Sequence, residues 1–110
     1  MTKYDHELYR IKAEFCKTLA DPTRQMMIAE LRGGEKTVGE IAEGIGITQS
    51  MTSHHLAILR SKGVVEARRE GANIYYSLVN PKIAEACDMV HDILMNQLAK
   101  NKEFADRLMS

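Results

Sequence analysis

Several short side chains able to donate or accept hydrogen bonds lie near the start of one predicted helix. They are Gln49, Ser50, Ser53 and His54. Thr48 stands just before them, where its hydroxyl can cap the helix by accepting from a backbone N–H group. Side chains of this kind at the N-terminal end of a helix can read base edges in the major groove of duplex DNA. The pattern predicts base contacts from these side chains and a phosphate contact from Thr48.

The two adjacent histidines of this helix fall on different sides of it. At about 100° per residue, His54 lies on the outer side near Ser53. His55 lies on the inner side, near Met51 and Leu59. We therefore expect a groove contact from His54 and a packed, hydrogen-bonded position for His55.

Two adjacent arginines, Arg68 and Arg69, come just before the predicted tip of a β-hairpin at residues 70–73. Long cationic side chains at such a tip can straddle a phosphate backbone or enter the neighbouring minor groove. Side chains alternate between the faces of a strand, so only one arginine can point to either face. Phosphate contact is the prediction for both, and two solvated charges are the alternative.

Two helices are predicted first along the chain. Apolar residues recur at helical spacing across residues 8–19, and this helix ends before Pro22, because the residue before a proline is pushed out of the helical region. Asp21 caps the second helix, and Pro22 suits its first position. The glycine pair at residues 33–34 ends it.

A helix-turn-helix follows. Thr37 and Glu40 form a capping box that opens a third helix, and Gly44 and Gly46 close it. The fourth helix, which carries the polar side chains described above, is predicted from residue 49 to about residue 61. Two short helices joined by a glycine-containing turn are typical of proteins that place the second helix in the major groove.

After Gly63 the apolar period changes from about 3.6 to about 2. This change predicts strands at residues 64–69 and 74–79, joined into a wing by the intervening turn. Beyond Pro81 a last helix carries an apolar stripe, and it continues or frays into the polar tail at residues 100–110.

The fold class is therefore mainly α with a β-hairpin wing, a winged helix-turn-helix of order α-α-α-α-β-β-α. We expect one domain over residues 1–110, because a chain of this length builds one small core. The terminal helices carry more apolar surface than that core can cover, so they are expected to form a homodimer. Such a dimer matches a pseudo-palindromic operator in double-stranded DNA, with half-sites about 34–36 Å apart.

Composition and sequence patterns also bear on which classes of protein can be excluded. The chain has 15 Lys and Arg against 15 Asp and Glu, so its overall charge gives no support for nucleic-acid binding, although residues 49–76 are mildly basic. No run of about 18 apolar residues and no apolar segment behind the N-terminus is present, which predicts no membrane span, no signal peptide and a cytoplasmic location. The sequence has no Gly-rich phosphate loop, nucleophile elbow or paired carboxylates, so an enzyme is not expected.

Four motif blocks span nearly the whole chain. They are LADPTR at residues 19–24, TVGEIA at 37–42, QSMTSHHLAIL at 49–59 and REGANIYYSL at 69–78. In this order and spacing they resemble the ArsR/SmtB family. The resemblance implies a dimeric winged-helix repressor that leaves its operator when an inducer, often a metal ion, binds.

The two metal sites familiar in that family lack their ligands in this sequence. The paired cysteines of one site would fall at residues 37–39, which are Thr, Val and Gly. The carboxylate and histidine ligands of the other would fall at Asn80, Lys82, Ile93 and Asn96. Neither set suits an ion such as zinc.

Cys16, Cys87 and His91 remain as candidates for an effector site. Cys87 and His91 are one helical turn apart and can share a ligand, and Cys16 can join them if the terminal helices pack together. Three interpretations stay open: buried thiols that only pack, thiol redox or persulfide sensing, and binding of a metal or metalloid. No cofactor is otherwise expected. The rival function is a winged-helix module without an inducer, either a constitutive DNA binder or a protein-interaction domain.

Overall fold

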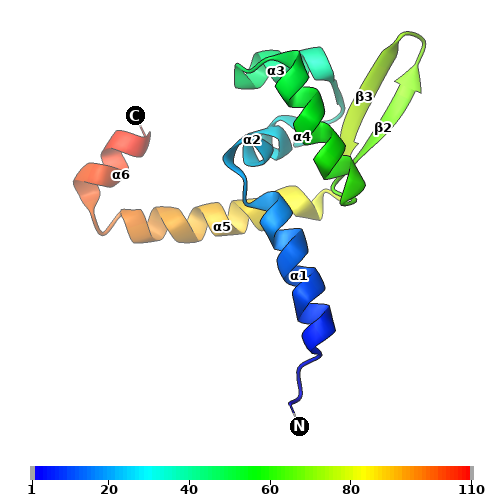
Figure 1. The fold of residues 1–110 in the computed structure, drawn as a ribbon. Helices are drawn as coiled ribbons and strands as arrows, with labels where there is room; N and C mark the ends of the chain where they lie inside the picture. The colour runs from blue at the N-terminus through cyan, green and yellow to red at the C-terminus, as the bar shows by residue number, and fades with distance from the viewer. Residues whose placement is uncertain (1, 110) are drawn as a thin grey trace. The chain divides into compact units, whose positions relative to one another are not determined.

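The computed structural model describes residues 2–109, and it has the predicted order of helices, hairpin and helix, with a short additional strand and helix (Figure 1). In chain order the elements are α1 (His6–Leu19), α2 (Pro22–Leu31), β1 (Lys36–Thr37), α3 (Val38–Ile45), α4 (Gln49–Ser61), β2 (Val65–Glu70), β3 (Asn73–Leu78), α5 (Lys82–Leu98) and α6 (Lys102–Met109). The chain divides into two compact units, one ending at Asn80 and the other beginning at Pro81.

Side-chain caps start each of the first four helices. Asp21, Thr37 and Thr48 accept from backbone N–H groups of the first turn of α2, α3 and α4, as the sequence predicted. Asp5 does the same for α1 and was not predicted. A capping-box glutamate then completes the start of α3, so the first helix of the helix-turn-helix begins at a defined residue.

The prediction that Gly44 helps to close α3 is wrong. The helix continues through Gly44 to Ile45, and Gly46 alone ends it in the left-handed conformation, with φ of 86°. A Cβ at Gly44 would overlap the Glu30 carboxylate of α2. The glycine therefore leaves room for the Glu30 carboxylate beside α3 and does not break the helix.

The strands form an antiparallel sheet in the order β1-β3-β2. Arg68 pairs with Tyr75, Arg69 with Ile74, and Glu70 with Asn73. The tip of the wing is therefore shorter than the four-residue turn predicted. Gly71, at φ of 63°, adopts the conformation that such a tight turn requires. Strand β1 was not predicted, and it pairs Thr37 with Tyr75.

A small apolar core holds the N-terminal unit together. Its fully or almost fully buried side chains come from α2, α3, α4, the residue before β2 and the first residue of β2. These are Met27, Ile28, Leu31, Ile41, Leu56, Leu59, Val64 and Val65. Thr52 is also fully buried, and its hydroxyl donates to the Thr48 carbonyl at 2.8 Å. The buried side of α4 is thus fixed by Thr52, Leu56 and Leu59, which leaves the opposite side to solvent.

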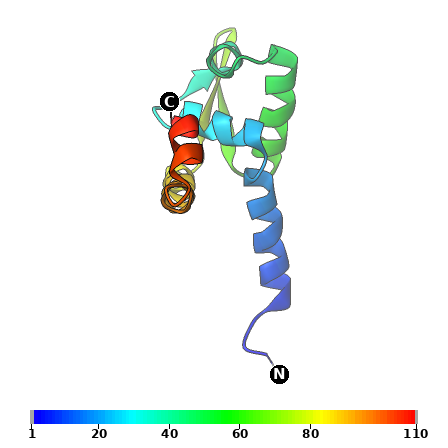
Figure 2. The same cartoon turned by 90° about the vertical axis from the view of Figure 1, so that its left-hand side faces the viewer.

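Helix α1 projects from the rest of the N-terminal unit, as two views at right angles show (Figures 1 and 2). Its apolar residues Leu8, Ile11 and Phe15 are 49%, 53% and 38% exposed. These are the residues whose helical spacing predicted an apolar stripe. The structure confirms the helix, and within the N-terminal unit these three side chains are exposed on it.

The C-terminal unit consists of α5 and α6. The polar tail is thus a second helix and not an extension or frayed end of α5, with the break at residues 99–101. Val90, Ile93 and Leu94 are exposed on α5. Over residues 2–109, none of the helices has the length and apolar character needed to span a membrane.

Candidate nucleic-acid interface

The outer side of α4 presents the polar side chains that the sequence singled out. Gln49, Ser50, Ser53 and His54 are all exposed, and none has a hydrogen-bond partner among the described residues. The Thr48 hydroxyl accepts from the Met51 N–H group at 3.1 Å and caps the helix, as predicted. The side chain of Met51 was predicted to face inward, and this is wrong, because the residue is 50% exposed. Thr52 occupies the interior instead.

His55 lies on the inner side of α4, in the packed position predicted for it. Its side chain is 14% exposed, and Nδ1 lies 3.5 Å from Arg24 Nη1 and 4.0 Å from Asp21 Oδ2. Arg24 Nε also donates to the Thr18 carbonyl at 2.7 Å. The pKa of Asp21 is lowered, chiefly because its carboxylate accepts from the Arg24 backbone N–H group. These contacts tie the inner side of α4 to the end of α1 and the start of α2.

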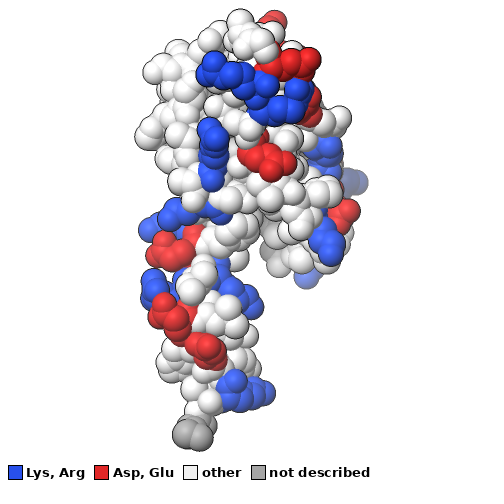
Figure 3. Space-filling model, turned by 90° about the vertical axis from the view of Figure 1, so that its right-hand side faces the viewer, with Lys and Arg blue, Asp and Glu red and all other residues white. Residues whose placement is uncertain are grey.

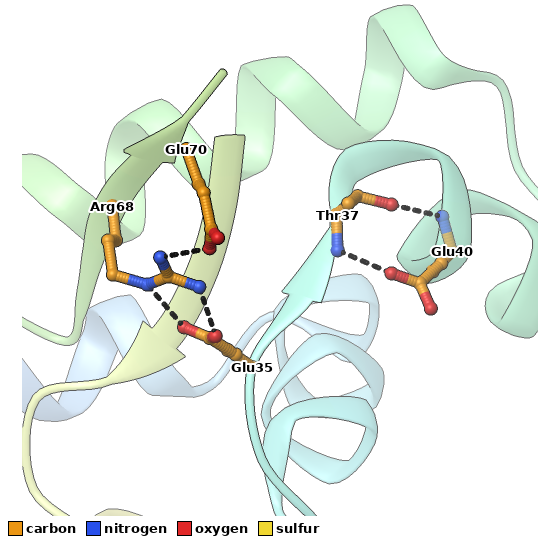
Figure 4. A network of polar contacts seen from close by, with 5 residues as sticks. All are labelled: Glu35, Thr37, Glu40, Arg68 and Glu70. Carbon is orange, nitrogen blue, oxygen red and sulfur yellow. Dashed lines mark hydrogen bonds and ion pairs between the residues drawn. The ribbon is translucent and has the colours of Figure 1, made fainter. Parts of the chain in front are cut away.

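Arg68 is held by two carboxylates (Figure 4). Its Nε donates to Glu35 Oε2 at 3.1 Å, and Nη2 donates to the other Glu35 oxygen. Nη1 donates to Glu70 Oε2 at 2.6 Å, and the guanidinium lies 4.9 Å from the ring centroid of Tyr75. Both carboxylates raise the pKa of Arg68 further above its ordinary value, the Glu35 hydrogen bond more than that of Glu70. Glu35 thus already makes with this guanidinium the bidentate contact that a phosphate group would make.

Arg69 is exposed, and it has no carboxylate partner among the described residues. The two arginines thus differ as strand alternation predicted, one on each face of the wing. Lys and Arg side chains are interspersed with Asp and Glu over the face drawn in Figure 3. For binding an anion such as a phosphate, a cation without a carboxylate neighbour is therefore more informative on this face than the total charge.

An open groove lies between the outer side of α4 and the wing. It has a volume of about 460 Å³ and is lined by Ser53, Ala57, Arg60, Ser61 and Tyr76. Arg60 lies in the mildly basic stretch of residues 49–76, but neither Arg60 nor Tyr76 was predicted as a site residue. Helical spacing could have found Arg60, because it lies two turns after Ser53 on the same side of α4. No local signal connects Tyr76 to the helix, since only the fold brings Tyr76 and α4 to the same groove.

The effector candidates are distributed over both units. Cys16 is exposed on α1 in the N-terminal unit, whereas Cys87 is half-buried and His91 exposed on α5 in the C-terminal unit. In the part of the chain that the structure describes, no three His, Cys, Asp or Glu side chains are grouped to hold a metal ion.

The fold and the exposed end of α4 define a winged helix-turn-helix DNA-binding protein. A protein-family model described as "bacterial regulatory protein, arsR family" matches residues 21–67. An HTH-type transcriptional regulator of Mycobacterium tuberculosis, Rv0081, is 40% identical over 93 residues, which cover 84% of this chain and 82% of that protein. The chain belongs to the ArsR family and is a DNA-binding regulator, not an enzyme.

Solved structures agree with this assignment. The crystal structure of Rv0081 has a TM-score of 0.79 at 38% identity, covering 88% of this chain and 98% of that one. The repressor BigR from Xylella fastidiosa has a TM-score of 0.73 at 38% identity, with coverage of 84% and 96%. A homodimeric winged helix-turn-helix DNA-binding domain from Mycobacterium bovis has a TM-score of 0.75 at 31% identity, with coverage of 89% and 94%.

Proposed function

We propose that this protein is a transcriptional repressor of the ArsR type, which binds a pseudo-palindromic operator as a homodimer and leaves it when an inducer binds. The observation that carries the proposal is the row of exposed, unpaired polar side chains at the start of α4. Relatives support the repressor function, among them the biofilm growth-associated repressor of Xylella fastidiosa, 39% identical over 85 residues.

In this proposal the residues of the interface have distinct functions. Base edges are contacted from the first turns of α4, where the side chains are short and solvated. The side chains that make these contacts are Gln49, Ser50, Ser53 and His54. Thr48 and Arg69 contact phosphates. The sequence predicted a phosphate contact for Arg68 as well. Its two carboxylate partners favour a different function, which is to hold the wing against the segment that contains Glu35.

Dimerisation is proposed to use the terminal helices, with the whole chain acting as one functional domain. The support is the exposed apolar surface on α1, including Ile11 and Phe15, and on α5, including Val90 and Leu94. A solvent-exposed stripe of this kind is costly for a monomer. The homodimeric relative from Mycobacterium bovis is consistent with this assembly.

The inducer is proposed to be a thiol-reactive species or a metal ion that acts through Cys16 and Cys87, with His91 as a third group. Cys16 is exposed, so it can react without unfolding of the chain. A ligand acts as an inducer only if it binds one of the two states of the repressor more tightly than the other.

The experiment that tests the function starts from a duplex that the protein selects from a random-sequence library. We expect a palindromic consensus, salt-dependent binding and release by an oxidant, a persulfide donor or one member of a metal panel. Failure to enrich any sequence would contradict the DNA-binding function and favour a protein-interaction module. Enrichment without release by any effector would identify a constitutive DNA binder.

A further inference from the structure

We propose that the groove between α4 and the wing binds the phosphate backbone of one DNA strand, and that Arg60 and Tyr76 make the contacts. The proposal rests on the DNA-binding function proposed above. It adds a second binding surface to that function, beyond the start of α4 and the tip of the wing. Its ligand is a phosphodiester strand of duplex DNA.

The groove begins where the proposed base contacts end. Ser53, Ala57 and Arg60 succeed one another along one side of α4, and all three line the groove. Tyr76 of β3 forms the opposite wall. A DNA strand in contact with Ser53 is thus led along the helix toward the guanidinium of Arg60.

The register of the wing determines which of its two arginines lies on the same face as Tyr76. Tyr76 pairs with Ala67, and because side chains alternate along a strand, Arg69 lies on the same face of the wing as Ala67. Arg68 lies on the other face with Tyr75, where its guanidinium is held by carboxylates. The groove face of the wing therefore carries the arginine that has no carboxylate partner among the described residues.

Arg60 is also exposed and has no ion pair in the described part of the chain. Two guanidiniums without carboxylate partners, Arg60 and Arg69, thus belong to one surface. The half-buried Tyr76 adds a phenolic donor to it. Cationic and hydroxyl donors are the groups that bind phosphate oxygens in protein–DNA complexes.

The geometry of duplex DNA explains why a strand must pass here. Neighbouring major and minor grooves are separated by one phosphate backbone. A protein that places a helix in the major groove and a wing at the adjacent minor groove spans that backbone. The space between helix and wing is then filled by phosphates, not by base edges.

The test compares the wild-type dimer with Arg60→Ala and Tyr76→Phe on the selected operator. We expect Arg60→Ala to weaken all sequences alike and to lower the slope of log K against log salt by about 0.9 for each phosphate contact, hence by about two for a dimer. Tyr76→Phe removes only the hydroxyl, and we expect it to weaken binding without changing this slope. Lys12→Ala, which removes a charge from α1, is the control and is expected to keep the wild-type slope.

Single methylphosphonate substitutions then identify the phosphate. One or two neutralised positions between the major-groove contacts and the wing should cost the wild type about tenfold in affinity and cost Arg60→Ala almost nothing. Thermal unfolding of each variant verifies that it is folded. If the wild type binds its operator and Arg60→Ala retains both the slope and the methylphosphonate sensitivity, the groove proposal is overturned and the DNA-binding function stands. If the wild type selects no operator, the function itself fails.

Discussion

Arg68 and Arg69 show how identical neighbouring side chains acquire different tasks. The strand directs them to opposite faces, and among the described residues only the face of Arg68 has acidic partners, Glu35 and Glu70. A guanidinium that is already bound bidentately gains little from a phosphate, because it would first have to give up equivalent hydrogen bonds. A solvated guanidinium has no such cost beyond side-chain ordering.

This difference gives a first prediction. Arg69→Ala should weaken binding to all duplexes alike and lower the salt slope by about one for each phosphate contact that is lost. Arg68→Ala should leave the slope close to that of the wild type and lower the thermal stability. Fluorescence anisotropy at several salt concentrations measures both slopes. The assignment is reversed if Arg68→Ala changes the slope and Arg69→Ala does not.

Base contacts give a second prediction at this scale. Ser53→Ala and His54→Ala should each weaken operator binding by about 1–3 kcal/mol and reduce discrimination at one base pair, while non-specific binding stays unchanged. Ala29→Ser, at an exposed position of α2 outside the proposed DNA surface, is the control. Binding to operators with single base changes supplies the measurement. Equal losses for the operator and for random duplexes would show that these side chains contact only the backbone.

The exposure of a side chain could be predicted from the sequence where it depends on the position of the residue around a single helix. The exposed position of His54 and the half-buried position of His55 follow from their helical phase. The same reasoning failed for Met51, which is 50% exposed, and overlooked the fully buried Thr52. A buried hydroxyl keeps a hydrogen bond when it donates to a carbonyl one turn earlier, as Thr52 does, and a hydrophobicity pattern does not detect this.

At the scale of elements, the wing is tied to the helix-turn-helix through β1. Glu35 precedes this strand and binds Arg68 of β2, while Thr37 ends the strand and caps α3 (Figure 4). The same few residues therefore hold the wing and start the first helix of the motif. A change in this segment is expected to alter the wing and α3 together.

The Glu35 carboxylate makes this connection sensitive to pH, which is the third prediction. Its pKa is lowered from the ordinary value of 4.5, chiefly by the hydrogen bond from Arg68. A lowered pKa in the folded state adds stability above the ordinary value, and this stability is lost as the pH falls through the lowered one. The difference in melting temperature between wild type and Glu35→Gln should therefore be largest near neutral pH and shrink below 4.5.

Glu66→Gln is the control for this experiment. Glu66 is exposed on β2 and has no ion pair within the described residues. Its variant should follow the wild-type curve at every pH. A constant offset between wild type and Glu35→Gln from neutral to acidic pH would contradict the prediction.

Element boundaries were predictable where the signal was local. Asp21 with Pro22 and Thr37 with Glu40 start helices through contacts within one turn, and the structure has both. Strand β1 was missed, because two residues show no period and the pairing partner Tyr75 is far away in the sequence. Gly44 was misinterpreted for a similar reason, since its neighbour Glu30 belongs to another helix.

At the scale of the whole molecule, the exposed apolar residues of α5 predict the effect of a charge. Leu94→Asp should convert the dimer to a monomer and abolish specific operator binding at the same time, because a carboxylate is costly to bury in an apolar interface. Sedimentation and operator binding are the measurements. Asn96→Asp, an added charge at a polar position of the same helix, should preserve both properties. A dimer that persists in Leu94→Asp would place the interface elsewhere.

The cysteines supply the last prediction. A double variant, Cys16→Ser with Cys87→Ser, should stay on its operator at the inducer concentration that releases the wild type. Titration of accessible thiols before and after inducer treatment shows whether the sulfur atoms themselves are modified. Release of the double variant by the same inducer would mean that these thiols do not form the effector site.

The balance of 15 basic and 15 acidic residues affects how such a regulator would search a genome. Affinity for arbitrary DNA depends on the number of phosphates that cations neutralise, and here one wing arginine is already neutralised within the chain. We expect few molecules to be sequestered on bulk chromosomal DNA. A small number of copies would then suffice to keep one operator occupied, and each molecule released by an inducer would return to free solution before it rebinds.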